Sequence, residues 1–260
     1  MSGPIVLCYH AISDRWPAPL AVRPQDLEEH VALLTARSYE SKTFSDAVRR
    51  PSSDKALAIT FDDAFRSVFD LAFPILSRAG FRATVFAPTG FIGSDEPMRW
   101  PGIDQWFATE HREELAPMSW EELRTLADAG WEVGSHSRRH PHLPRLGQEA
   151  LEEELVQSRQ DIERRLGRPC CSLSYPFGDY EERIVQAARR AGYTAAAGTA
   201  RWGLYAPSST LDWPRTVVSR VDGPRRFRLK ISPRMRWLRG TVAWRLLIRA
   251  RRGTRKATAT

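Results

Sequence analysis

Ala58–Asp63 reads Ala-Ile-Thr-Phe-Asp-Asp, an apolar run that ends abruptly on two adjacent carboxylates. Such a run predicts a buried strand that delivers charge at its own carboxyl end. In parallel α/β sheets this end carries the chemistry, so Asp62 and Asp63 are candidates for a functional site. The alternative is that one of them caps a helix beginning near Ala64, although a cap needs one acid and not two. This stretch alone leaves both interpretations open.

A second stretch, Trp131–His142, begins as another short apolar strand and then carries His136 and His140, four residues apart. On a helical turn, residues i and i+4 lie on one face, so both imidazoles could reach one cation. A lone histidine is more often structural, but this pair follows a strand end in a chain with a double Asp after another strand. The spacing resembles the His-Glu-x-x-His helix of zinc proteases, yet Ser137 stands where that helix has its Glu base.

Together these stretches resemble the polysaccharide deacetylase family, also called the NodB-homology or carbohydrate esterase 4 family. Thr60–Asp63 matches its Thr-Phe-Asp-Asp motif, and His136–His140 matches its His-Ser/Thr-x-x-His motif. Ser174–Tyr180 is similar to its Pro-aromatic-Gly loop, and the opening Tyr9–Ile12 is similar to the exopolysaccharide deacetylase branch. The resemblance runs over about residues 4–222 and implies an α/β fold, a distorted (β/α) barrel of the NodB-homology type.

The resemblance also implies roles for individual residues. The implied metal ligands are Asp63, His136 and His140, around a divalent ion that is zinc in the first place, with Co²⁺ or Ni²⁺ as alternatives. Asp62 is the implied general base that takes a proton from water. The loop residues implied to bind the substrate or its oxyanion are Tyr175, Pro176, Phe177 and Gly178, with the backbone N–H of Phe177 as the donor.

The chain departs from the common family pattern at two places. Ser174 stands where the pattern has an Arg that pairs with the base, and Arg215 is our substitute for it, the alternative being a surface arginine. The pattern also has a late His for the leaving group, but no His follows His142. We expect His10, at the end of the first strand, to replace it as acid or orienting group. His30 and His111 are weaker candidates for this role. His142 is expected at the surface.

The hydrophobic periodicity predicts a parallel sheet whose strands are connected by helices, as in βαβ units. The predicted strands are 5–10, 55–63, 82–88, 172–175, 194–197 and 215–221, and the predicted helices are 24–37, 65–79, 119–130, 148–166 and 181–191. The charges of helix 148–166 are expected on its solvated face. Between them, the aromatic-rich segment 90–117 either walls a sugar site or packs on the barrel.

The charge is distributed unevenly. The formal net charge is +8, but 13 of the 39 Lys and Arg residues and none of the 31 acids follow residue 222. We therefore expect a catalytic domain over 1–222 and a basic, partly helical tail over 223–260. Residues 234–252 mix arginines with Trp and aliphatic residues, which suits an anionic membrane surface. Docking on a partner glycosyltransferase or on the barrel is the alternative, and nucleic acid is disfavoured because no nucleic-acid motif is recognised.

The amino terminus has no basic segment before its short apolar run, so we expect no signal peptide. No stretch reaches about 18 uninterrupted apolar residues, so we expect no membrane span and a cytoplasmic location, with peripheral attachment at the membrane as an extension. The odd count of three cysteines predicts buried free thiols. The expected activity is metal-dependent hydrolysis of an N-acetyl group on a polysaccharide, oligosaccharide or lipid-linked glycan. The alternatives are a carbohydrate O-deacetylase or a non-catalytic carbohydrate-binding protein on the same fold.

Overall fold

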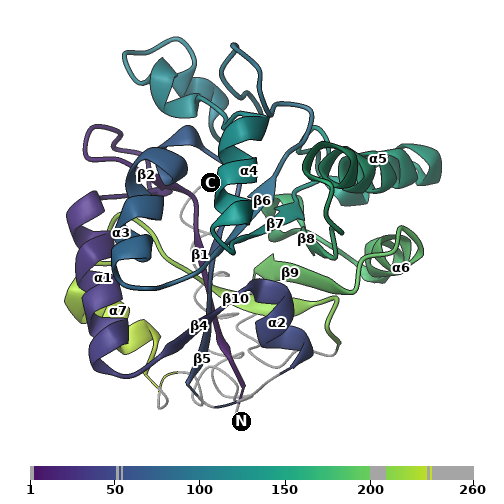
Figure 1. Ribbon diagram of the computed structural model, residues 1–260. Coiled ribbons are helices and arrows are strands. Elements are labelled where there is room, and N and C mark those ends of the chain that lie inside the picture. Colours follow the sequence, from purple (N-terminus) through teal and green to yellow (C-terminus); the bar gives the residue numbers. More distant parts are fainter. Residues whose placement is uncertain (1–2, 51–52, 54, 200–208, 233–234, 236–260) are drawn as a thin grey trace, which may run out of the picture.

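Seven parallel strands close into a ring at the centre of the computed structural model, which describes residues 3–50, 53, 55–199, 209–232 and 235 (Figure 1). In chain order the strands are β1 Ile5–Tyr9, β5 Ala56–Phe61, β6 Thr84–Ala87, β7 Glu132–Ser135, β8 Ser172–Ser174, β9 Ala195–Thr199 and β10 Trp213–Val217. The ring closes because β1 pairs with β5 on one side and with β10 on the other. The predicted (β/α) barrel is confirmed.

The ring is distorted by an eighth strand. β4, Glu40–Lys42, pairs with the first half of β5, while β6 pairs with its second half on the same edge. Strands β1, β5 and β6 are buried along their whole length. This explains their nearly continuous apolar sequences, since a parallel sheet covered on both faces has no polar side.

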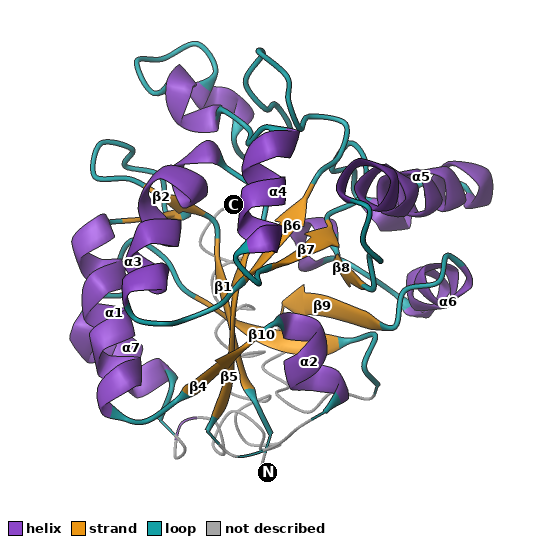
Figure 2. Cartoon of the chain, viewed as in Figure 1, coloured by secondary structure: helices purple, strands orange, loops and turns teal. Residues whose placement is uncertain are grey.

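Helices surround the ring (Figure 2). They are α1 Pro24–Ala36, α2 Phe44–Arg49, α3 Phe73–Arg78, α4 Trp120–Asp128, α5 Gln148–Leu166, α6 Glu182–Arg190 and α7 Pro224–Lys230. Shorter segments are the strands β2 Ala11–Ile12 and β3 Ala21–Val22, the π-helix η1 Val68–Ala72, and the 3₁₀ turns η2 Asp104–Trp106, η3 Arg112–Leu115, η4 Leu143–Arg145 and η5 Pro176–Gly178. Local sequence sets several boundaries: Pro24 opens α1, Ser119 and Glu122 form a capping box on α4, and Gly167 ends α5 at φ 68°.

Several predicted elements differ from the observed ones. The helix expected over 65–79 starts with the π-helix η1, and the strand expected over 215–221 lies at Trp213–Val217. β4 and α2 were not predicted, because three polar residues and a six-residue helix give too short a periodic signal.

The folded core continues past residue 222. Phe227 on α7 and Ile231 after it are fully buried in the main core, and the Phe227 ring stacks on His30 of α1 at 3.8 Å between centroids. The described residues 223–232 therefore pack on the barrel, beyond the boundary that the charge distribution suggested. The segment 234–252 lies outside the described residues, apart from Met235.

The three cysteines are free, with Cys8 and Cys170 buried and Cys171 half-buried. Within the part of the chain that the structure describes, no helix is both long and apolar enough to cross a bilayer.

Candidate active site

The candidate residues gather at the carboxyl ends of strands on one side of the ring. Asp62 and Asp63 follow β5, His10 follows β1, and His136 follows β7. Since parallel strands end at the same rim of a barrel, segments far apart in the sequence meet there. Four polar side chains from three strands thus reach one small region.

Arg215 on β10 forms a bidentate ion pair with Asp62. Its Nη1 and Nη2 donate to Oδ1 and Oδ2 of the carboxylate, both at 2.7 Å, and its side chain is 0% exposed. Nη1 also donates to Oγ1 of Thr60 and Nη2 to Oγ of Ser174, at 3.0 and 2.8 Å. Ser174 stands at the sequence position of the family's Arg, and Arg215 takes the place of that arginine in space. These two residues therefore contact each other.

Two more groups donate to the same carboxylate. Oδ2 of Asp62 accepts the Ser174 hydroxyl at 3.1 Å and the Cys8 thiol at 3.6 Å. Burial alone would raise the pKa of Asp62, but the charge and hydrogen bonds of Arg215 outweigh it and hold this pKa well below its usual range. Asp62 is therefore an ionised carboxylate of fixed orientation.

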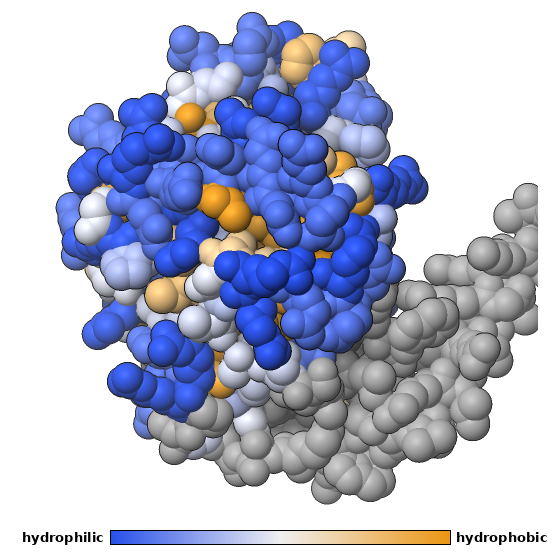
Figure 3. Space-filling model, turned by 90° about the vertical axis from the view of Figure 1, so that its right-hand side faces the viewer, coloured by the Kyte–Doolittle hydropathy of each residue, from blue (hydrophilic) through white to orange (hydrophobic). Residues whose placement is uncertain are grey.

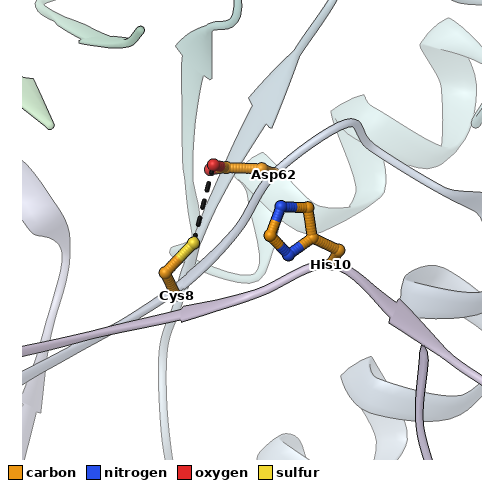
Figure 4. Close-up of side chains that lie close together, drawn as sticks. All are labelled: Cys8, His10 and Asp62. Carbon is orange, nitrogen blue, oxygen red and sulfur yellow. Dashed lines mark hydrogen bonds between the residues drawn. The ribbon is translucent and has the colours of Figure 1, made fainter. Parts of the chain in front are cut away.

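His10 lies beside Cys8 and Asp62 (Figure 4). Polar atoms of Cys8, His10 and Asp62 come within 4.8 Å of one another, and Nδ1 of His10 is buried with no hydrogen-bond partner among the described residues. A cation does not suit this trio, because Arg215 already occupies both oxygens of Asp62. The structure places His10 close to Asp62, as its place at the end of β1 predicts.

Asp63, His136 and His140 form a second buried cluster. Nε2 of His136 lies 3.3 Å from Oδ1 of Asp63, and Nε2 of His140 lies 3.4 Å from the same oxygen. This oxygen has no hydrogen-bond partner among the described residues. Two ligands bound at about 2.0–2.1 Å on tetrahedral positions would be roughly 3.3 Å apart. An unpartnered buried carboxylate oxygen with two imidazole nitrogens at this spacing fits a divalent ion.

The charges agree with this fit. Asp62 and Arg215 compensate each other, which leaves the buried carboxylate of Asp63 in need of a positive partner. Burial would raise its pKa, but the nearby histidines, of which His136 is the nearest, outweigh it and lower the pKa of Asp63. Burial lowers the pKa of His140 to about 3, so this imidazole is neutral, as a ligand must be. Burial also acts to lower the pKa of His136, but the carboxylates of Asp62 and Asp63 outweigh it and raise this pKa.

The two histidines do not lie on a helical turn, which corrects the prediction. Segment 136–140 is a loop in which Ser137 and His140 have positive φ, 61° and 57°. Asp63 and Ala64 also have positive φ, 71° and 51°. Such conformations are uncommon outside glycine and cluster at functional sites. The imidazoles converge because the loop is bent, not because of helical periodicity.

His136 is oriented by Ser174, the last residue of β8. Its Nδ1 lies 2.7 Å from the carbonyl oxygen of Ser174, so the ring donates there and presents Nε2 to Asp63. Ligating histidines commonly make such an outer hydrogen bond, which fixes the tautomer. Ser174 therefore touches both halves of the site, through its hydroxyl and through its carbonyl.

Among the four loop residues predicted to bind the substrate, Tyr175 to Gly178, only Phe177 is exposed. Tyr175 is buried and donates to the carbonyl of Leu211 at 2.8 Å, and Pro176 and Gly178 are buried as well. Phe177 is 37% exposed, has φ 59°, and stacks on His142 at 3.8 Å between centroids. His142, expected at the surface, is half-buried and supports Phe177 at the edge of the site.

The remaining candidates have structural environments. His30 is buried, Nδ1 lying 3.1 Å from the Tyr9 hydroxyl and Nε2 2.7 Å from the Asp222 carbonyl. His111 packs edge-on against Trp106 in the insertion. Trp100 of that insertion is buried and stacks on His140 at 4.2 Å, so it packs behind a candidate ligand.

Sequence reasoning missed three contributors to the site. Cys8 lies inside an apolar strand, where a small polar residue gives no signal of its own, and Thr60 was matched as part of a motif without a role of its own. Glu154 on α5 was assigned to a solvated face, yet it is buried and its carboxylate binds the histidine loop. Its position between Leu151 and Ser158 on the inward stripe is the signal that could have identified it.

The comparisons agree with this geometry. The sequence profile of the polysaccharide deacetylase family matches residues 49–196, which hold the Thr-Phe-Asp-Asp motif, the two-histidine motif and the Pro-aromatic-Gly loop. The chain belongs to the polysaccharide deacetylase family. A curated member, YxkH of Bacillus subtilis, is 26% identical over 200 residues, which cover 75% of this chain and 63% of YxkH. This chain thus spans less than two thirds of that relative.

Three solved structures share the fold. A polysaccharide deacetylase from Bacillus cereus superposes with a TM-score of 0.70 at 22% identity, over 88% of this chain and 69% of the other. IcaB from Ammonifex degensii gives 0.73 at 21% identity, over 89% and 98%. PplD of Streptococcus pyogenes, solved with acetate, gives 0.72 at 20% identity, over 88% and 98%. At these identities the similarity establishes the NodB-type barrel.

Proposed function

We propose that this family member is a metal-dependent hydrolase that removes the acetyl group from an N-acetylated sugar. The substrate class is a polysaccharide, an oligosaccharide or a lipid-linked glycan. The observation that carries the proposal is the buried cluster of Asp63, His136 and His140 next to the Asp62–Arg215 ion pair. One cluster suits a divalent cation, and the other holds an ionised carboxylate beside it.

Asp63, His136 and His140 would hold the ion. A set of two imidazoles and one carboxylate favours zinc, with Co²⁺ and Ni²⁺ as alternatives. When bound, such an ion would polarise the acetyl carbonyl and make water more acidic. The same ligand set leaves coordination positions free, as a catalytic site requires.

The remaining steps belong to the side chains. Asp62 would accept the proton of the attacking water, and Arg215 with Ser174 keeps its carboxylate in place. The backbone N–H of Phe177 would donate to the oxygen that becomes negative. His10 would then give a proton to the leaving nitrogen, so that acetate and a free amine are released.

An O-deacetylase would use the same residues. The leaving alkoxide also needs a proton, so the side chains alone do not separate an ester from an amide substrate. A carbohydrate-binding protein without chemistry is the other alternative, and the intact base and ligand cluster argue against it.

Acetate release on a panel of substrates tests the proposal. The panel contains free N-acetylglucosamine, its oligosaccharides, a lipid-linked N-acetylated sugar and an O-acetylated glycan, each with metal-loaded and chelator-treated protein. We expect metal-dependent release from an N-acetyl substrate. Release from the O-acetyl substrate alone would favour the ester alternative, and no release in any arm would reject the proposed activity.

We also propose that an anionic membrane surface binds residues 234–252 and places the enzyme at the inner face of the membrane. The mixture of arginine, tryptophan and aliphatic residues in this segment supports the proposal. A partner glycosyltransferase is the alternative occupant.

A further inference from the structure

Helix α5 carries polar residues on its inward side. Leu151 and Leu155 pack into the core, and Glu154 and Ser158, each one turn further along from one of these leucines, are buried as well. Residues three and four apart lie on one helix face, so these four form a single stripe. The outer side of the molecule here, which α5 and α6 cover, is mostly hydrophilic (Figure 3). The expectation that all charges of α5 are solvated is therefore wrong for Glu154.

Glu154 binds the backbone of the histidine loop. Its Oε2 accepts the N–H groups of Arg138 and Arg139, both at 2.8 Å, while the residue is only 8% exposed. Hydrogen bonds to an ionised acceptor are roughly twice as strong as neutral ones. One carboxylate oxygen thus fixes two consecutive peptide groups between His136 and His140.

Ser158 continues this support. Its hydroxyl lies 2.8 Å from that of Ser135, whose Oγ accepts the N–H of Ser137 at 3.1 Å. The Ser137 hydroxyl in turn accepts the N–H of His140 at 3.1 Å. The hydrogen bonds therefore run from α5 to the second histidine.

The loop is held from its other side by the segment after β6. The N–H groups of Thr89 and Gly90 donate to the carbonyls of Ser137 and Arg138 at 3.2 and 2.8 Å. A Cβ on Gly90 would lie 2.8 Å from the Arg138 oxygen, so this approach needs glycine. The loop backbone therefore donates towards α5 and accepts from β6.

The positive φ of His140 makes this support necessary. A non-glycine residue in that region costs about 1–3 kcal/mol and persists only where its surroundings fix it. Without Glu154, the N–H groups of Arg138 and Arg139 would lose their shared acceptor, and the loop would gain by relaxing. Relaxation would move the His140 imidazole away from Asp63.

We propose that Glu154 is a positioning residue for the candidate metal site: its buried carboxylate binds the loop backbone and so presents His140 to Asp63. The inference rests on the proposed function for the identity of the site as a metal centre. It concerns the geometry of the site, and Glu154 itself touches neither metal nor substrate.

Cobalt binding tests the proposal apart from activity. Metal-free wild-type protein and the variants Glu154→Ala, Glu154→Gln and Glu149→Ala are titrated with Co²⁺, and the visible absorption of the bound ion is recorded. Glu149 is the matched control because it is an exposed glutamate on the same helix. Thermal unfolding of each metal-free protein is measured in parallel.

We expect Glu154→Ala to weaken Co²⁺ binding by about 10- to 100-fold, the usual effect of losing an outer partner of a ligand, and to change the absorption spectrum. Glu154→Gln keeps one acceptor oxygen without the charge, so its affinity for Co²⁺ should fall between those of the wild type and Glu154→Ala. Glu149→Ala should behave as wild type. Wild-type affinity and spectrum in Glu154→Ala would overturn the proposal. If that variant does not fold, wild-type affinity in Glu154→Gln would overturn it.

Acetate release by the same preparations separates the two proposals. A wild-type protein that binds Co²⁺ but releases no acetate counts against the deacetylase activity, whereas weakened binding in the Glu154 variants still supports the positioning role. A wild-type protein that binds no Co²⁺ overturns the positioning role together with the metal site.

Discussion

Arg215 and Asp62 face each other across the barrel interior as a fully buried bidentate pair, joined by two 2.7 Å hydrogen bonds. The arginine comes from β10 and the carboxylate from the end of β5, two strands that are separated in the ring by β1. The pair therefore connects strands that share no backbone hydrogen bonds. It also fixes the orientation of the carboxylate that we propose as the base.

Replacement of Arg215 by Met should lower the free energy of unfolding by about 3–5 kcal/mol, because it leaves a buried carboxylate without its partner. The double variant Asp62→Leu with Arg215→Met should recover much of this loss, since neither charge remains. Urea unfolding measures both effects, with Arg189→Met on the exposed side of α6 as the control. A loss below about 1 kcal/mol in Arg215→Met would show that the pair does not contribute as a buried ion pair.

The base and the ligands should respond differently to substitution. Asp62→Asn should lower turnover by about 10²- to 10⁴-fold while metal stays bound, because Asn keeps the shape but is not a base. His136→Ala and His140→Ala should lose the metal, since each would remove one of the three proposed protein ligands. Metal content and acetate release are measured on the same samples. Equal loss of metal in all three variants would contradict the separation of roles.

The sequence predicts this site well where chemistry follows directly from a strand end. The run at Ala58–Asp63 identifies a buried strand and its acids, since apolar content and position are local properties. Arg215 needed the resemblance to the family, because nothing local shows that an arginine on β10 turns inward. The bend at His140 was not predictable either: its positive φ is imposed by contacts from α5 and β6, which are distant in sequence.

His10→Ala should impair amide hydrolysis much more than hydrolysis of an activated ester. A leaving amine needs a proton, whereas the phenolate of an aryl acetate leaves without one. We therefore expect a fall of about 10²-fold or more on an N-acetylated sugar and a small change on 4-nitrophenyl acetate. His111→Ala in the insertion is the matched control. Full activity of His10→Ala on the N-acetyl substrate would reject its role as the acid.

His30 should make the fold sensitive to mild acid. Burial lowers its pKa in the folded protein, although Asp26 and Glu29 on α1 and Asp222 before α7 act to raise it. The unfolded chain then takes up a proton first, at about pH 6.5, so the free energy of unfolding falls as pH drops through that value. The Tyr9 hydroxyl and the Asp222 carbonyl hold the neutral ring.

His30→Gln removes this titration. Urea unfolding at a series of pH values between about 7 and 5 should therefore show a smaller decrease in the variant than in the wild type. Burial acts to raise the pKa of Asp222, but hydrogen bonds from Lys230 and Ser219 outweigh it and lower this pKa. Asp222 therefore loses its stabilising effect only at lower pH, near the usual range of carboxylates. Parallel pH curves for the two proteins would contradict the assignment to His30.

Removal of the basic tail should abolish binding to anionic membranes. Nine Lys and Arg residues and no acids follow Ser232, and each would contribute on the order of 1 kcal/mol near an anionic surface. The shortened chain should end at Ser232 and not at Asp222, because Phe227 and Ile231 are buried in the core.

We expect the full chain to pellet with phosphatidylglycerol-containing vesicles at low salt and to stay in solution with pure phosphatidylcholine. It should detach from the anionic vesicles at high salt, because surface charges are then screened. The shortened chain should stay in solution throughout, while its thermal unfolding matches that of the full chain. If both chains stay in solution with anionic vesicles, the membrane proposal is wrong, and co-purification with a membrane glycosyltransferase becomes the next measurement.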